Sequence, residues 1–255
     1  MKVSRLLWVW LFVLFLSTGT ALAGKYTAGL GAGIAPDYEG SDDMTAVPML
    51  MLRGNYDSGR YFALMGTNFK LNVIPDDRFS FGPALNYRKA RDGAGYNNGY
   101  KIKDVDAAYE IGAFGRLNMY NCLLELEYLT DVSNTHDGWV VIASAGYKWV
   151  ANEVLTITPG VFSTYASDDY MNTYFGVIDN GKYVENGIKD VGANIIVHYT
   201  PWDKWGIMGV MSYSTFDNDS DAKRSPVVED DNQLSFGLMA TYSWDDNRRR
   251  RRGRR

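Results

Sequence analysis

The feature that most constrains the fold of this 255-residue chain is an apolar side chain at every second position of many segments. Residues 233–244 show it most clearly, because one parity is wholly apolar and the other is mostly small or polar. A period of two is typical of β-strands with two unlike faces, so the sequence predicts an all-β fold. The same pattern recurs in five further segments, 79–88, 109–117, 122–128, 139–149 and 190–199.

Two architectures produce such strands, and they differ in which face meets water. In a soluble sandwich or a lipocalin-type barrel, the apolar face points inward. In an outer-membrane barrel, the apolar face meets lipid and the polar face lines the lumen. Here the apolar sets tend to end in Tyr or Trp, while the opposite faces carry glycines and charged residues. These features favour the membrane barrel.

The first 23 residues have the pattern of a cleavable secretory signal peptide. Lys2 and Arg5 precede an apolar run at 6–16, and the sequence Ala21-Leu22-Ala23 places small residues at both positions of a cleavage site. The run is short for a membrane-spanning helix, which needs roughly 20 apolar residues. We therefore expect export, a barrel domain at 24–244 and an arginine-rich tail at 245–255.

Connection lengths support a bacterial barrel, which alternates short periplasmic turns with longer external loops. The spacing predicts a twelve-stranded antiparallel transmembrane β-barrel in the cell outer membrane. The exception to the alternation is a tight turn at Gly66-Thr67, and if the two short strands beside it form an irregular segment, the count is ten. We place the strands at 25–34, 45–53, 60–66, 67–74, 79–89, 105–117, 121–131, 139–149, 154–164, 188–200, 204–214 and 232–244.

Charge and cysteine content narrow the possible partners and sources of stability. Residues 24–244 carry 17 basic and 28 acidic residues, a formal charge of −11, whereas nucleic-acid binding needs a basic face. The single cysteine, Cys122, excludes an intrachain disulfide and a cysteine-rich zinc module. We expect no nucleic-acid partner, no cofactor and no metal site.

Charged residues fall on the polar parity of several predicted strands, which would place them in the lumen. One interpretation is a network of ion pairs that fills a narrow barrel, because an unpaired charge at low dielectric is costly. The other is a polar channel whose charged rings select solutes. The predicted lumen charges are Arg88, Glu110, Arg116, Glu125, Glu127 and Lys148.

Signals for catalysis and metal binding are weak. His198 could act as a general base for Ser212 or Ser214, as in an outer-membrane phospholipase, but nothing in the sequence fixes that geometry. His136 falls in a predicted loop with no nearby ligand partner. The acidic run 217–221 resembles the start of a calcium loop, yet Ala222 and Val228 stand where the motif needs glycine and a bidentate acid. We predict no catalytic residue and interpret the run as a solvated loop.

Three short motifs, in order and spacing, resemble the MltA-interacting protein/OmpV family of outer-membrane proteins. The resemblance extends from about Tyr26 to Trp244, and the last motif is the terminal strand ending Tyr242-Ser243-Trp244. Members end on or near this aromatic residue, so the arginine-rich extension departs from the pattern. We interpret it as solvated, with an electrostatic tether as the alternative. The motif residues that carry the resemblance are Pro36, Tyr38, Gly40 and Ser41, followed by Gly82, Pro83, Tyr87 and Arg88.

The resemblance implies an outer-membrane barrel without enzymatic activity that acts as a scaffold in murein and envelope maintenance. It implies a lytic murein transglycosylase and a murein synthase as partners, beside outer-membrane lipid and lipopolysaccharide. A scaffold would contact periplasmic partners through its short turns, and we single out Trp202 as an aromatic anchor. The alternative function is a channel for small solutes or antibiotics.

Overall fold

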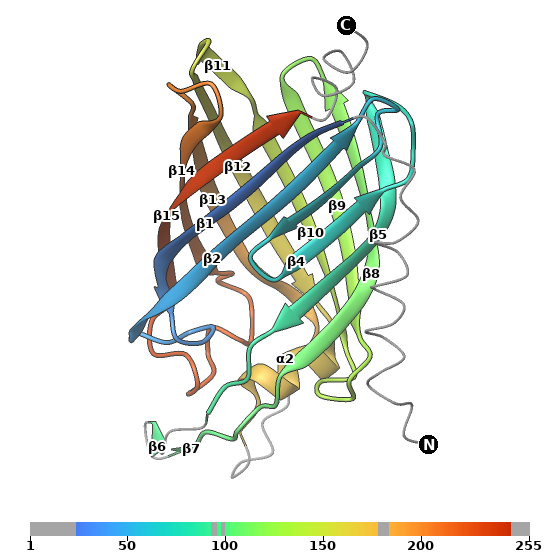
Figure 1. The fold of residues 1–255 in the computed structure, drawn as a ribbon. Helices are drawn as coiled ribbons and strands as arrows, with labels where there is room; N and C mark the ends of the chain where they lie inside the picture. Colours follow the sequence, from blue (N-terminus) through green and yellow to red (C-terminus); the bar gives the residue numbers. More distant parts are fainter. Residues whose placement is uncertain (1–23, 93–95, 98–99, 178–183, 246–255) are drawn as a thin grey trace, which may run out of the picture.

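The computed structural model describes residues 24–92, 96–97, 100–177 and 184–245, which form a barrel of antiparallel strands (Figure 1). The predicted signal peptide lies outside the described residues, and so does the predicted tail except for Asp245, which ends the last strand.

The barrel wall has twelve strand positions, which we call staves. One stave is interrupted at Lys148 and therefore counts as two strands, β10 and β11. A separate two-stranded hairpin of β6 (Tyr96–Asn97) and β7 (Tyr100–Lys101) lies beyond the wall. The wall strands are β1 (Gly24–Pro36), β2 (Met44–Tyr56), β3 (Tyr61–Met65), β4 (Asn68–Asn72), β5 (Phe79–Arg88), β8 (Ala108–Met119), β9 (Cys122–Asp131), β10 (Trp139–Tyr147), β11 (Trp149–Asn152), β12 (Leu155–Ala166), β13 (Gly187–Tyr199), β14 (Trp205–Phe216) and β15 (Asn232–Asp245).

Two pairings close the sheet on itself. The first and last strands pair along ten positions, from Lys25 opposite Asp245 to Ile34 opposite Phe236. At the other seam β10 pairs with β12, so every stave has a neighbour on both sides. The structure therefore confirms the twelve-stranded antiparallel barrel. The short strands β3 and β4 are both present, and their tight turn uses Gly66 in the left-handed region, at φ +58°.

The apolar parity faces outward. Leu30 on β1 is 69% exposed and Leu126 on β9 is 56% exposed, and Phe81, Leu85 and Phe236 also lie on the outer surface. On the opposite parity, residues such as Glu110 and Met239 are almost fully buried inside the barrel. The outward face is thus apolar, as contact with lipid requires. The alternative architecture, a soluble sandwich or lipocalin-type barrel with an apolar interior, is wrong.

The longer connections gather at one end of the barrel, which we call the loop end, and the short ones at the turn end (Figure 1). At the loop end, the predicted connection 165–187 contains a helix that the sequence analysis missed, α2 (Asp168–Phe175). The Ser167 side chain caps it by accepting from the Tyr170 N–H, and its Tyr170, Met171 and Phe175 side chains are buried. The described residues contain no helix long and apolar enough to span a membrane.

Glycines on β1 and β15 let the lumen wall pack closely on that side. A Cβ at Gly31 would lie 1.9 Å from the carbonyl oxygen of Leu238, and one at Gly237 would lie 1.9 Å from the Met49 sulfur. Met51, Met208 and Met239 form a buried cluster on this wall, against which Met49 packs. Flexible methionine side chains thus occupy the space that these glycines leave open.

The outward apolar face predicts a depth-dependent cost for a charge. Leu238 lies at the middle of β15, so Leu238→Arg should lower the free energy of unfolding in lipid vesicles by about 2–4 kcal/mol. The matched variant Leu234→Arg, nearer the loop end of the same strand, should cost only about 0–1 kcal/mol. Urea titrations of vesicle-inserted protein measure both, and equal costs at the two depths would contradict a lipid-facing strand.

Candidate functional site

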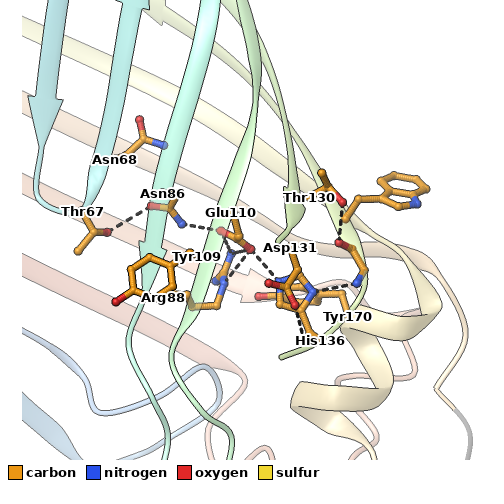
Figure 2. Close-up of polar contacts among 12 residues, drawn as sticks. Thr67, Asn68, Asn86, Arg88, Tyr109, Glu110, Thr130, Asp131, His136 and Tyr170 are labelled. Carbon is orange, nitrogen blue, oxygen red and sulfur yellow. Dashed lines mark hydrogen bonds and ion pairs between the residues drawn. The ribbon is translucent and has the colours of Figure 1, made fainter. Parts of the chain in front are cut away.

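A network of charged and aromatic side chains lies at the loop end of the lumen, and Glu110 on β8 is at its centre (Figure 2). The buried Glu110 carboxylate accepts hydrogen bonds from Arg88 Nε and Nη2, each at 3.2 Å, and from Asn86 Nδ2 at 2.6 Å. It also lies 3.1 Å from His136 Nε2. Strand β5 and the 132–138 loop therefore place polar groups on one buried carboxylate of β8. We call this set of residues, together with those described in the next paragraphs, the mouth network.

His136 reaches Glu110 because the preceding aspartate folds the 132–138 loop. The Asp131 carboxylate accepts from the N–H groups of Ser133, Thr135, His136 and Asp137, at 2.6–3.1 Å. The N–H of Gly138 donates to His136 Nδ1 at 3.1 Å, which leaves Nε2 to carry the hydrogen toward Glu110.

The sequence predicts a loop position for His136 with no nearby ligand partner, whereas the structure places it against Glu110. The available signal was an aspartate that starts a Ser-, Asn- and Thr-rich turn, a composition that favours local side-chain hydrogen bonds. This signal identifies a structured loop, but it does not identify the carboxylate that the loop reaches.

Arg88 connects Glu110 to the β1–β2 loop and to α2. Its Nη1 lies 3.1 Å from Glu39, and its guanidinium lies over the rings of Tyr170 at 4.9 Å and Tyr174 at 5.6 Å. Glu39 in turn accepts from the Tyr170 hydroxyl at 2.9 Å and lies 3.3 Å from Lys189 Nζ. The mouth network thus comprises Glu39, Asn86, Arg88, Glu110, His136, Tyr170, Tyr174 and Lys189.

Electrostatics in the loops follow from these contacts. Burial opposes ionisation of Glu39, but the positive charges of Lys189 and Arg88 outweigh it and hold the pKa of Glu39 below its usual range. Burial raises the pKa of Tyr170 and of Tyr174, so both phenols stay protonated and can donate. Burial and the neighbouring Glu229 raise the pKa of Tyr38 to about 12.

A second ion cluster lies deeper in the lumen. Lys70 on β4 lies 2.6 Å from Glu125 and 2.7 Å from Glu127, and Arg116 lies 2.5 Å from Glu125. Asn68 donates to Glu127 at 2.8 Å. Lys70 is not among the lumen charges predicted from the sequence, although Asn68, Lys70 and Asn72 mark a polar parity on that short strand.

The predicted lumen charges thus separate into three groups. Arg88 and Glu110 belong to the mouth network, while Arg116, Glu125 and Glu127 form the deeper cluster with Lys70. Lys148 belongs to neither group: it is exposed at the break between β10 and β11, where its N–H donates to the Asn121 carbonyl at 2.7 Å. The register with β12 is the same on both sides of the break, with Gly146 opposite Gly160 and Trp149 opposite Ile157, so Lys148 keeps the polar parity at the turn end of the barrel.

The first family motif folds against the last long loop. Gly40 adopts φ +96°, and a Cβ there would lie 2.9 Å from the Val228 side chain. Tyr38 donates from its hydroxyl to Glu229 at 2.9 Å, and the Ser41 hydroxyl accepts from the Asp43 N–H at 3.1 Å. Pro36 ends β1, so these residues fix the route of the chain over the mouth.

The second motif lies on β5. A Cβ at Gly82 would lie 1.9 Å from the Leu71 carbonyl oxygen, and Tyr87 packs outside the barrel on Tyr109, with ring centroids 5.4 Å apart. Pro83 offers no N–H to the neighbouring strand. Beside it the buried Asn72 side chain accepts from the Phe81 N–H at 3.0 Å.

The structure does not assemble the catalytic arrangement that we considered from the sequence. His198 pairs with Met208 across β13 and β14, whereas Ser212 pairs with Asn194, four residues along the strand, or about 13 Å. His198 Nε2 lies 3.3 Å from the Thr241 hydroxyl instead.

Two basic residues follow the acidic run 217–221. Lys223 Nζ donates to Asn218 at 2.8 Å and lies 3.2 Å from Asp231, while Arg224 lies 3.5 Å from Asp221. In the part of the chain that the structure describes, no three metal-ligating side chains converge on one point.

Inward side chains are tightly packed at several heights of the lumen, whereas Arg116 in the deeper cluster keeps 26% of its side chain exposed, and a cavity lies at the loop end. Tyr170 near the mouth, Phe114 at mid-height and Asn72 near the turn end are each 0–1% exposed although they face inward. The cavity has a volume of about 330 Å³ and lies between the β1–β2 loop, the end of β5 and the start of β13. Its lining includes Glu39, Arg88 and Lys189 of the mouth network, together with Arg91 and Asp190.

A closed antiparallel barrel with an apolar outer surface, a polar lumen, short turns at one end and long loops at the other defines the class of outer-membrane β-barrel proteins. The chain belongs to the MltA-interacting protein MipA family, whose model matches residues 28–244. The protein therefore lies in the outer membrane. A comparison with curated proteins finds no match.

Solved barrels show weak overall similarity. The translocator domain of autotransporter NalP from Neisseria meningitidis is 9% identical, with a TM-score of 0.45 and 91% of each chain covered. The outer-membrane channel DcaP of Acinetobacter baumannii is 9% identical, with a TM-score of 0.37, 87% of this chain and 96% of that chain. A Pseudomonas aeruginosa FadL homologue is 11% identical, with a TM-score of 0.41, 86% of this chain and 90% of that one.

The mouth network predicts acid-sensitive loops. Because folding lowers the pKa of Glu39, its stabilising effect is complete above the ordinary value of 4.5 and is lost as the pH falls through the lowered value. The protection of the α2 amides, which is the slowing of their exchange relative to the intrinsic rate at the same pH, should therefore fall below about pH 4.5. Glu39→Gln should lower this protection at neutral pH and lose part of the fall in acid, and an unchanged acid response would refute the role of Glu39.

Proposed function

We propose that this barrel acts as a non-enzymatic scaffold in murein and envelope maintenance. The observation that carries the proposal is the packing of the lumen, since an inward side chain near the mouth, one at mid-height and one near the turn end, those of Tyr170, Phe114 and Asn72, are each 0–1% exposed. Because a packed lumen leaves little room for solute passage, the surfaces at the two ends of the barrel are the places where another protein can bind. The family description names an interaction with MltA, which supports a murein hydrolase as one partner of this chain.

The turn end supplies the surface for such a partner, because short turns of bacterial barrels face the periplasm, where murein lies. Trp202 projects from the 200–204 turn and is 58% exposed. Exposed tryptophans are enriched among residues that dominate binding, although they also anchor barrels at the membrane interface. We assign Trp202 the role of partner anchor, and the hydrolase and a murein synthase the role of partners.

The anchor role predicts a selective loss of binding. Trp202→Ala should weaken capture of the murein hydrolase by about tenfold or more, measured with purified hydrolase and barrel refolded in detergent. The control is Trp139→Ala at the loop end, where Trp139 stacks on Tyr165 at 5.8 Å. Equal affinities for wild type and Trp202→Ala would remove Trp202 from the interface, and no capture by wild type would reject the hydrolase as partner.

The competing function is a channel for small solutes or antibiotics, which the charged cavity at the mouth favours. The packed lumen predicts that refolded protein in planar bilayers gives no discrete conductance steps. A channel predicts steps whose ion selectivity changes in Glu125→Gln or Arg116→Gln, since both side chains lie in the deeper cluster. Such steps would overturn the packed-lumen argument without affecting the barrel assignment.

A further inference from the structure

The cavity at the loop end contains polar atoms that the protein itself does not satisfy. Four buried side-chain atoms lack a hydrogen-bond partner among the described residues, and three of them belong to residues that line this cavity. They are Arg91 Nε, the Tyr174 hydroxyl and Asp190 Oδ1, in residues that are 5%, 5% and 8% exposed. A buried polar atom without a partner costs free energy, so their convergence on one cavity indicates a ligand.

The charges around the cavity show what the ligand must carry. Lys89 lies 3.0 Å from Asp37, Arg88 lies 3.1 Å from Glu39, and Lys189 is paired with Glu39 and Asp190. Arg91 differs from these cations. Its Nη1 donates to the Tyr174 carbonyl at 2.6 Å and its Nη2 to the Lys103 carbonyl at 3.4 Å.

Both acceptors of Arg91 are neutral. The Arg91 guanidinium lies over the Tyr38 ring at 5.5 Å, and within the described residues no carboxylate lies within ion-pair distance of it. In that part of the chain Arg91 is a buried cation without a directly bound counter-ion.

Arg91 needs an acceptor from the ligand, whereas Asp190 needs a donor. Its Oδ2 is bound by Lys189, but Oδ1 has no donor, and an amino or hydroxyl group would satisfy it. The Tyr174 hydroxyl can donate to the same anion as Arg91 Nε. Ser212, Ser214 and Gln233 also line the cavity and offer further polar contacts.

We propose that this cavity binds a small carboxylate that carries an amino or hydroxyl group, such as an amino acid or a sugar acid. Its carboxylate accepts from Arg91 Nε and the Tyr174 hydroxyl, and its amino or hydroxyl group donates to Asp190 Oδ1. The volume of about 330 Å³ suits a ligand of that size. The exposed Asp37–Lys89 pair lies at the rim, on the side of the long loops, so the ligand enters from outside the cell.

The test uses full-length barrel refolded in detergent, with binding measured by isothermal titration calorimetry. L-glutamine supplies a carboxylate and an amino group, and D-gluconate supplies a carboxylate and hydroxyls. Butyrate lacks the donor and ethanolamine lacks the carboxylate. We expect glutamine or gluconate to bind, with butyrate and ethanolamine at least about tenfold weaker. Whichever of the two binds distinguishes an amino acid from a sugar acid.

A matched pair of variants connects binding to the cavity. Tyr174→Phe removes only a hydroxyl that makes no hydrogen bond within the described protein, so the barrel should fold and the affinity should fall about five- to tenfold. Tyr61→Phe removes the fourth unpartnered buried hydroxyl, which lies on β3 outside the cavity lining, and should leave affinity unchanged.

Three outcomes would overturn the proposal. They are no binding of glutamine or gluconate up to about 10 mM, wild-type affinity in Tyr174→Phe, or an equal loss in both variants. The proposal does not depend on the scaffold function, because it concerns the opposite end of the barrel.

Discussion

The structure depends on one constraint, which is that a chain surrounded by hydrocarbon must satisfy every backbone N–H and C=O group internally. A sheet meets this requirement only when it closes, and here β1 with β15 and β10 with β12 leave no open edge. The constraint also explains local details. Where the pairing of β4 with β5 ends, after Lys70 opposite Ala84, the Asn72 side chain accepts from the Phe81 N–H and satisfies it within the wall.

Closure creates a second problem, because the polar parity of each strand now faces an enclosed space. One wall solves it with charges that neutralise each other, as Lys70, Arg116, Glu125 and Glu127 do in the deeper cluster. The facing wall of β1, β2, β14 and β15 uses methionines over glycines. A charged wall and a flexible apolar wall together fill a twelve-stranded lumen, which strand number alone does not do.

The loop end combines closure with an unsatisfied site. The Asp131 turn, α2 and the 36–41 motif bring three side chains, those of His136, Tyr170 and Glu39, to Arg88 and Glu110. Opposite charges and hydrogen-bond partners from different loops therefore hold the mouth in place. Beside this compensated network lie Arg91 and Asp190 with unfilled hydrogen-bonding capacity. The paired charges of the mouth network stabilise the mouth, whereas the unpartnered polar atoms of Arg91 and Asp190 indicate a place for a ligand. Both groups lie within one set of loops.

The sequence by itself determined the barrel, its twelve strands and the outward direction of the greasy face, because a two-residue period and the lengths of connections are local properties. It also placed Arg88, Glu110 and Glu125 on the polar parity. It did not find the roles of Lys70, His136 and Arg91, and it did not find α2. Those features depend on which loops fold together over the mouth, and such contacts join residues as distant as Glu39 and Lys189. Parity tells which way a side chain on a strand points, but only the tertiary structure decides which partner it meets there and which polar atoms are left without one.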